Sequence, residues 1–201
     1  TDITGRQPYK YKSEVRADVT GGDFNDHSVH VFSIANHHDV IIDGFRMIGG
    51  NGNIAKPDPA QMSDKDYAEE MALYNSVANG GGVAMNNVRE TFPRDMTGNI
   101  IRNCVIANCA ATEGAAIFVN GDAEHGSEDR KCIAELTVVN TVIRNCTAGD
   151  TWDNPDRYVA NDVTPILDQI TYQGICSSNG EKAKIVFRNC DLVNNCGFPF
   201  R

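Results

Sequence analysis

The stretch I-I-R-N-C-V-I-A-N-C at residues 100–109 decides the fold of this chain, because it recurs along the sequence. Related stretches are I-I-D-G-F-R-M-I-G-G at 41–50, V-V-N-T-V-I-R-N-C at 138–146 and V-F-R-N-C-D-L-V-N-N at 186–195. Each copy holds two short apolar runs, and a Gly or Asn follows each run. The first set of these turn formers is Gly44, Asn103, Asn140 and Asn189, and the second set is Gly49, Asn108, Asn145 and Asn194.

A further apolar segment precedes each copy. These segments are V-H-V-F-S-I-A-N at 29–36, G-G-G-V-A-M-N-N at 80–87, G-A-A-I-F-V-N-G at 114–121 and Q-I-T-Y-Q-G-I-C at 169–176. The apolar runs keep their length, while the spacing between copies varies. Because one coil cannot bury its inner face alone, we expect the four copies to stack as parallel coils, with the insertions in outer loops.

The composition favours strands and excludes some partners. The 201 residues include 17 Val and 16 Ile against 4 Leu, and β-branched side chains suit pleated strands. The length is compatible with one domain spanning 1–201. A net charge of −9 argues against nucleic acid or an anionic membrane as a partner, since both need a basic face. No apolar run is long enough to span a bilayer.

The alignment of the copies predicts which side chains point inward and which residues make the corners. Met47, Ile106, Ile143 and Leu192 occupy equivalent positions, so we expect them to stack on one inward face. The two sets of turn formers should line two separate edges of the stack. Asn suits such corners because it tolerates the left-handed conformation and its side chain can bond the Asn of the next coil.

The motifs G-G-G-V-A-M-N-N, N-C-V-I-A-N-C and G-A-A-I-F-V-N-G, across about residues 20–198, resemble a known family. They look like the repeats of the pectate-lyase-like superfamily, in particular those of large exported bacterial surface proteins. The resemblance implies an all-β fold, a right-handed parallel β-helix of about four coils with loop insertions and one short helix. It also implies an extracellular or cell-surface location associated with the bacterial outer membrane. Because the family spans lyases, glycosidases, adhesins and passive stalks, it leaves the activity open.

The longest insertion covers about 51–79 and contains S-D-K-D-Y-A-E-E-M-A-L-Y. Ser63 is suited to the N-cap position, and the good helix formers after it predict a short helix over about 64–74. Tyr67, Met71 and Tyr74 recur at helical spacing, so they form one apolar face. The helix either docks this face on the coils or uses Tyr67 and Tyr74 to bind a ligand.

The second insertion, at about 148–168, contains the only tryptophan, Trp152, with Tyr158 nearby. An aromatic ring beside acidic side chains is typical of sugar contact, because the ring stacks on C–H faces and carboxylates accept hydroxyl protons. Asp150 and Asp153 are the acidic candidates for this contact. Together with Asp156, they are also spaced so that Ca²⁺ is an alternative ligand, although the Gly and Glu positions of an EF-hand are absent. A solvated loop around a packed Trp152 is the third interpretation. No other cofactor is expected.

Known catalytic and metal motifs are absent. The chain has no N-T-D, G-H-G or R-I-K signature of polygalacturonase-type hydrolases, and no nucleophile elbow or phosphate-binding loop. The charged residues of the aligned strands are expected to solvate the outer face; they are Asp39, Asp43, Arg46, Arg102, Arg144 and Arg188. The histidines His27, His30, His37 and His38 do not have the spacing of a metal site.

The seven cysteines mostly follow the repeat. Cys104 and Cys190 share one position of the copies, and Cys109 and Cys146 share a corner position. Stacked thiols behave as small apolar side chains, and we expect reduced stacks, with oxidation of some stacked pairs as the alternative.

These observations favour a non-catalytic module at the cell surface that binds glycan, binds another surface component or serves as a rigid spacer. The alternative is a carbohydrate-active enzyme, a polysaccharide lyase or glycoside hydrolase, with its site under the two insertions. The expected partners are a polysaccharide or a surface protein. Because a stack of coils exposes unpaired backbone at both ends, we also expect a further domain or chain to cover those ends, in a longer protein.

Overall fold

The chain is described here from a computed structural model. The structure describes residues 13–17, 30–52, 59–68, 79–86, 94–121, 132–149 and 174–201. Within this part of the chain the fold is mostly strand, and every strand pairing is parallel. The all-β, parallel class expected from the repeat is therefore present.

The strands form three larger sheets and one small sheet. Sheet C contains β2 (Phe32–Ala35), β5 (Val83–Asn86), β9 (Ile117–Asn120), β13 (Gly174–Asn179) and β16 (Phe198–Phe200). Sheet D contains β3 (Ile41–Asp43), β6 (Met96–Arg102), β10 (Ala134–Val139) and β14 (Ala183–Arg188). Sheet A contains β1 (Ser13–Arg16), β4 (Phe45–Ile48), β7 (Val105–Ala107), β11 (Val142–Arg144) and β15 (Asp191–Val193). Sheet B contains β8 (Ala110–Ala111) and β12 (Thr147–Ala148).

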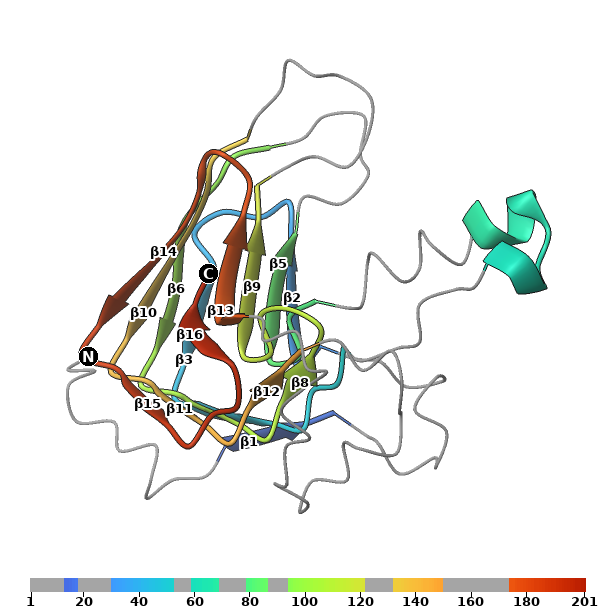
Figure 1. Cartoon of the computed structure of the whole chain (residues 1–201). Helices are drawn as coiled ribbons and strands as arrows, with labels where there is room; N and C mark the ends of the chain where they lie inside the picture. The colour runs from blue at the N-terminus through green and yellow to red at the C-terminus, as the bar shows by residue number, and fades with distance from the viewer. Residues whose placement is uncertain are drawn as a thin grey trace.

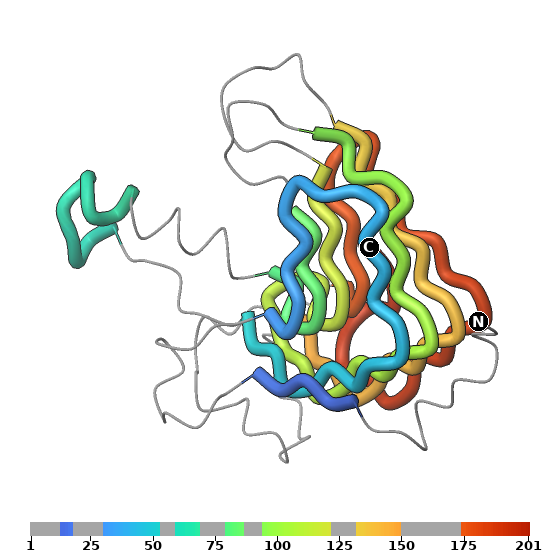
Figure 2. The backbone as a smooth tube through the Cα atoms, turned by 180° about the vertical axis from the view of Figure 1, so that it is seen from behind, coloured from blue at the N-terminus to red at the C-terminus, as the bar shows by residue number. Residues whose placement is uncertain are grey.

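The chain visits the sheets in the same order on every pass. A strand of sheet C leads to one of sheet D, then to one of sheet A, and the next pass pairs with the previous one. Figure 1 shows sheets D, A and C as three sides of one outline, with the C-terminal strands nearest the viewer. Figure 2, from behind, shows the coils following one another from blue to red. The repeat in the sequence is therefore a repeat of coils in space.

The two predicted sets of turn formers lie at two fixed corners, as expected. Between sheets D and A, Gly44, Asn103, Asn140 and Asn189 all have positive φ, from 47° to 81°. At the end of each sheet A strand, Gly49, Asn108, Asn145 and Asn194 have φ from 53° to 77°. Glycine and asparagine are the residues that enter this left-handed region most readily, so the sequence requirement at each corner is conformational.

The corner asparagines are joined by side-chain hydrogen bonds from coil to coil. At the first corner, the Nδ2 of Asn140 donates to the Oδ1 of Asn103 at 3.3 Å, and the Nδ2 of Asn189 donates to the Oδ1 of Asn140 at 2.6 Å. At the second corner, Asn145 donates to Asn108 at 3.4 Å and Asn194 donates to Asn145 at 2.9 Å. We call these chains of bonds the first and second Asn ladders. They fix the register of neighbouring coils at both edges of sheet A.

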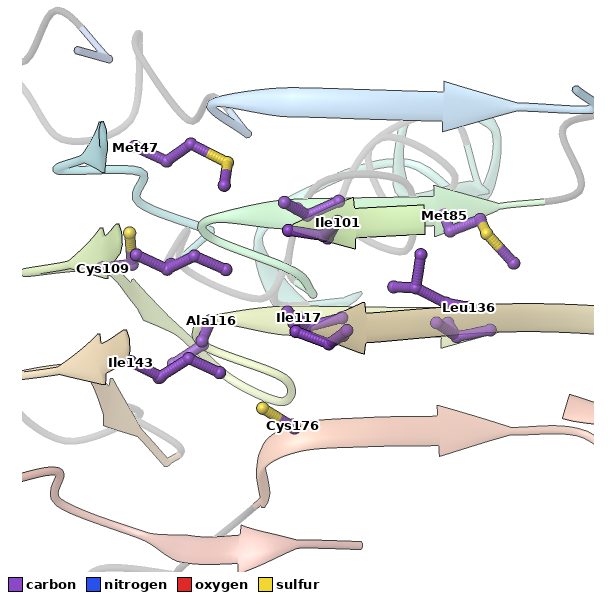
Figure 3. Packing of buried hydrophobic residues seen from close by; sticks show 14 of the residues in the cluster. Met47, Met85, Ile101, Cys109, Ala116, Ile117, Leu136, Ile143 and Cys176 are labelled. Carbon is purple, nitrogen blue, oxygen red and sulfur yellow. The ribbon is translucent and has the colours of Figure 1, made fainter. Parts of the chain in front are cut away.

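The inward side chains stack in rows along the coils (Figure 3). Met47, Ile106 and Ile143 are register partners and are fully buried, as predicted. Leu192 continues this row but is only half-buried, because its strand is the last of sheet A. Equivalent rows in the other sheets pair Ile101 with Val138 and Val83 with Ile117, and all four are fully buried.

Asn99 is one of four polar side chains that are buried among the described residues, and no local sequence pattern indicates its burial. Asn99 is 1% exposed and occupies an inward position of sheet D, where it is the register partner of Leu136. Its Oδ1 accepts the backbone N–H of Val40 at 3.0 Å, and its Nδ2 donates to the carbonyl of His37 at 3.1 Å. A buried amide is tolerated when its polar atoms are bonded, and here it holds the corner before β3.

The fourth copy of the sheet C segment was wrongly placed at 169–176. The strand β13 covers Gly174–Asn179, with Cys176 paired to Ile117 and Asn179 paired to Asn120. The sequence alignment followed the apolar side chains of Ile170 and Tyr172, whereas the strand contains two serines. Ser177 is nevertheless fully buried, because its hydroxyl has a partner in Glu113.

The two ends of the stack differ, although both were expected to be open. At the N-terminal end, the inward residues Ile34, Ile42 and Met47 are at most 5% exposed. There β1 pairs with β4, and the rings of Phe32 and Phe45 make an edge contact at 5.7 Å. At the other end, strands β14, β15 and β16 are the last of their sheets, and their inward side chains are only partly covered. Only the C-terminal end is open in the described part of the chain.

We predict that Ile106→Ala lowers the free energy of unfolding by about 2–4 kcal/mol, because it leaves a cavity in a fully packed row. Urea denaturation measures this change. The matched control is Ile41→Ala, since Ile41 is 53% exposed on the outer face and its loss should change stability by less than about 0.5 kcal/mol. Equal effects of the two substitutions would contradict the assigned inward face.

We also predict that Asn140 stabilises the stack in two separable ways. Asn140→Gly keeps the left-handed corner but removes both ladder bonds, and should lower stability by about 1 kcal/mol. Asn140→Ala removes the same bonds but keeps a Cβ in the left-handed region, where Gly has none, and should be less stable than the Gly variant by roughly 1–2 kcal/mol. Thermal and urea unfolding of the three proteins tests both statements. A Gly variant as stable as the parent would show that the ladder contributes nothing.

Candidate functional site

Most of the side chains proposed from the sequence lie outside the described residues. They are Tyr74, Asp150, Trp152, Asp153, Asp156 and Tyr158. The glycan and calcium hypotheses for the 148–168 insertion therefore stay predictions. Of the proposed ligand-binding side chains, Tyr67 is the one that falls within the described ranges.

A short helix follows Ser63, as predicted, and its described part covers 64–68, after the 3₁₀ turn η2 (Pro59–Gln61). The Ser63 Oγ accepts the backbone N–H of Asp66 at 3.2 Å and donates to the Asp66 carboxylate at 2.7 Å, which caps the first turn. Tyr67 is half-buried and the rest of this segment is exposed. Both views draw the helix apart from the coils (Figures 1 and 2). Met71 and Tyr74 of the expected apolar face lie outside the described residues, so docking of that face stays a prediction.

The histidines do not converge. The Nδ1 of His30 lies 2.8 Å from the carbonyl oxygen of Gly80, and the Nδ1 of His38 lies 2.8 Å from the exposed carboxylate of Asp39. His27 lies outside the described residues. Where the structure describes side chains, no group of three or more His, Cys, Asp or Glu is arranged to hold a metal ion.

The outer face of sheet A has a hollow of about 190 Å³, lined by Arg46, Val105, Val142 and Arg144. Arg46, Val105 and Val142 are register partners on β4, β7 and β11. Arg144 follows Val142 by two residues on β11, so its side chain points to the same face. The hollow, called here the sheet A hollow, thus has a valine floor between two guanidinium groups.

The two arginines of the sheet A hollow differ in their partners. The Nη1 of Arg46 lies 3.4 Å from the carboxylate of Glu14, so its charge is partly neutralised. Arg144 is exposed, and no described residue forms an ion pair with it. The exposed Asp191 is the register partner of Val142 on the next strand, so a carboxylate borders the valine floor. The hollow therefore combines a cationic donor with an apolar surface, and a carboxylate lies on the neighbouring strand.

A second polar cluster lies at sheet C and consists of Glu113 before β9, Ser177 within β13 and Arg201 directly after β16. The buried Ser177 hydroxyl donates to the Glu113 carboxylate, and the Nε of Arg201 lies 4.0 Å from the same carboxylate. The backbone N–H of Gly80 donates to the Glu113 carbonyl at 3.0 Å. No sequence motif indicates this cluster, because its members come from separate coils. Stacking alone brings them together.

The charged residues of sheet D make structural contacts. The Nε of Arg102 donates to the Asp43 carboxylate at 3.0 Å, and the Nδ2 of Asn103 donates to the other Asp43 oxygen at 2.9 Å. Asp43 is therefore the first member of the first Asn ladder. This role was not expected, because Asp43 was interpreted as a solvating residue of the outer face.

The residues that follow the corner asparagines bond back to the chain in one recurring way. After five of the six corner asparagines, a thiol or hydroxyl donates to the carbonyl two residues earlier, at 2.9–3.5 Å. The donors are Cys104, Cys109, Thr141, Cys146 and Cys190. The exception is Asn195, which follows Asn194 and donates to the carbonyl of Ile143 at 3.1 Å. The recurring Asn-Cys pair is thus explained by the corner itself, where a small donor satisfies a nearby backbone acceptor.

The described residues include all seven cysteines, and none of them forms a disulfide. Burial raises the pKa of the Cys104 thiol, and it raises the pKa of the Cys176 thiol strongly. The pKa of Cys146 is also raised, first by its hydrogen bond to Cys109 and then by burial. Because the thiolate is the reactive form, these raised pKa values make Cys104, Cys146 and Cys176 poor nucleophiles.

The buried thiols predict a loss of stability at alkaline pH. In the unfolded chain a thiol ionises near its ordinary pKa of 9.0, whereas the folded state keeps Cys176 protonated. The contribution of protonated Cys176 to the free energy of unfolding is complete below that pH. As the pH rises above it, this free energy falls by up to about 1.4 kcal/mol per pH unit. Urea denaturation under reducing conditions, between about pH 8 and about pH 10, measures this loss.

Cys176→Ala should show a smaller loss over that range than the parent protein. The control Cys196→Ala removes an exposed thiol and should leave the pH dependence unchanged. The same pH dependence in all three proteins would contradict the proposed effect of burial.

Comparison with known proteins leaves the function to be inferred from the residues themselves. None of the helices in the described residues has the length and apolar character required to cross a membrane. The chain matches no protein-family model, no curated protein and no solved structure.

Proposed function

We propose that this chain is a right-handed parallel β-helix of the pectate-lyase-like kind that binds an acidic glycan in the sheet A hollow. The hollow itself is the observation that carries the proposal. Arg144 offers a guanidinium fork to a sugar carboxylate, and such charge-assisted pairs are among the stronger hydrogen bonds. Val105 and Val142 supply an apolar surface for sugar C–H groups. Asp191, on the strand next to Val142, can accept a hydrogen bond from a sugar hydroxyl.

The framework supports a binding or spacer role. The two Asn ladders and the buried rows hold the outward side chains of sheet A at fixed positions, so the hollow exists before a ligand arrives. A preorganised site loses little entropy on binding. Right-handedness follows from the general rule for parallel crossovers, about 98% of which have that hand. The resemblance to exported repeats favours a polysaccharide or surface-protein partner outside the bacterial cell.

The cluster of Glu113, Ser177 and Arg201 favours a second candidate function, cleavage of a carbohydrate. A carboxylate beside a guanidinium can pair a proton acceptor with a group that stabilises negative charge. The described part of the cluster has one carboxylate, whereas glycosidases use a pair. This alternative therefore ranks below binding, and the product assay below decides between the two.

The test is isothermal titration calorimetry of the chain with oligogalacturonate and with a neutral oligosaccharide of equal length. We expect binding of the acidic ligand, and a loss of about tenfold or more in affinity for Arg144→Gln, because one charge-assisted pair is removed. Arg188→Gln is the matched control, since Arg188 is also exposed but lies on sheet D. Its affinity should match that of the parent.

Two results would contradict the binding proposal. One is equal affinity for the acidic and the neutral oligosaccharide. The other is an equal loss in both arginine variants, which would indicate a diffuse charge effect. Chromatography of the same mixtures detects shortened products, and product formation abolished by Glu113→Gln would establish the enzyme alternative instead.

A further inference from the structure

The core is exposed at the C-terminal end of the stack. Phe200 pairs in register with Cys176, and the side chains of that row point inward. Earlier members of the row, Val83, Ile117 and Cys176, are at most 1% exposed, whereas Phe200 is 55% exposed. Phe187 and Leu192 likewise end fully buried rows and are only half-buried. Phe198, 56% exposed, completes this apolar surface.

The open surface is the cross-section of a core, not a scattered set of apolar residues. The rings of Phe187 and Phe200 contact each other across sheets D and C, with centroids 4.9 Å apart. Strands β14, β15 and β16, each the last of its sheet, surround these rings and present a row of backbone groups. We call this surface the open end. Its shape and edges match one more coil, because every earlier coil sits on such a surface.

The first Asn ladder has a direction, and Asp43 sets it. A carboxylate only accepts hydrogen bonds, so Asn103 must turn its Nδ2 toward Asp43 and its Oδ1 toward the next coil. Each later asparagine then donates backward and accepts from the coil that follows. At the open end, no described residue donates to the Oδ1 of Asn189 or of Asn194. The open end therefore presents two amide acceptors beside its apolar surface.

We propose that the open end binds an extended polypeptide segment of a partner protein, which adds a parallel coil on β14 and β15. The segment carries apolar side chains at alternate positions and a carboxamide, as in Asn, at each of two corners. Its backbone pairs with the strand edges, and its amides donate to Asn189 and Asn194. Addition of a strand to an exposed sheet edge is an established mode of peptide recognition.

A second copy of this chain fits the open end less well. Head-to-tail stacking would place the N-terminal end of one copy on the open end of another. At that N-terminal end Ile34 and Ile42 are already buried, and the first ladder ends in the Asp43 carboxylate. Asp43 would face the Oδ1 of Asn189, so two acceptors would meet without a donor.

The probe is a synthetic peptide that copies residues 134–148 of this chain, A-E-L-T-V-V-N-T-V-I-R-N-C-T-A, with its cysteine replaced by serine. It contains a sheet D strand, both corner asparagines and a sheet A strand. Calorimetry with the whole chain should give saturable binding at one peptide per chain. A peptide with both asparagines changed to aspartate should bind at least about tenfold more weakly, because acceptors then meet acceptors.

Protein variants locate the binding surface. Phe200→Ser should weaken peptide binding about tenfold or more, since it removes an apolar contact of the open end. Ile41→Ser is the control, because Ile41 is similarly exposed but belongs to the first strand of sheet D at the other end. Its affinity should equal that of the parent. The aspartate peptide needs no protein variant, so the test stands even if Phe200→Ser unfolds.

Three outcomes would overturn the proposal. They are no binding of the parent peptide, equal binding of the asparagine and aspartate peptides, and equal weakening by the two protein variants. Sedimentation equilibrium of the chain alone adds a fourth. Concentration-dependent association that Phe200→Ser abolishes would assign the open end to contact between copies of this chain.

Discussion

The left-handed corner between sheets D and A is the constraint on which the rest of the structure depends. Each pass must bend at one residue as it leaves sheet D for sheet A, and Gly and Asn adopt the left-handed conformation of this bend at the lowest cost. Because Asn also carries an amide, the corner that turns the chain also bonds it to the neighbouring coil. The register of sheets D and A, and therefore the inward rows, follows from this position.

The register also determines what the outer surface can do. Side chains two residues apart on a short strand share a face, so Val142 and Arg144 are carried outward together while Ile143 anchors the strand in the core. Outward-facing side chains can be substituted without altering the inward row, because outward and inward positions alternate along the strand. Such separation explains how a repetitive framework can hold a specific polar arrangement at one position only.

The repeating part of the fold was predictable from the sequence, and the exceptions have physical causes. Asn103, Asn108 and Ile106 recur in equivalent form, so their corners and inward face could be read from the alignment. Asn99 and Ser177 are polar side chains made compatible with burial by partners from other coils, and no local pattern reveals such partners. The sheet A hollow was missed as a unit, since its two arginines are far apart in sequence and become neighbours only through stacking. The aromatic and acidic residues of the 148–168 insertion lie outside the repeat, so the periodic pattern that predicted the coils does not predict their positions.

The corner spacing has an evolutionary consequence. Residues 104–140 run from just after one first-ladder asparagine to the next, and they contain β7, β8, β9 and β10, one complete circuit of the stack. A tandem duplication of the corresponding gene segment would insert a whole coil whose corners, inward row and ladder amides match those on either side. The molecule can therefore lengthen by unequal recombination without a period of misfolded intermediates, and each event would add about 4.8 Å to its height.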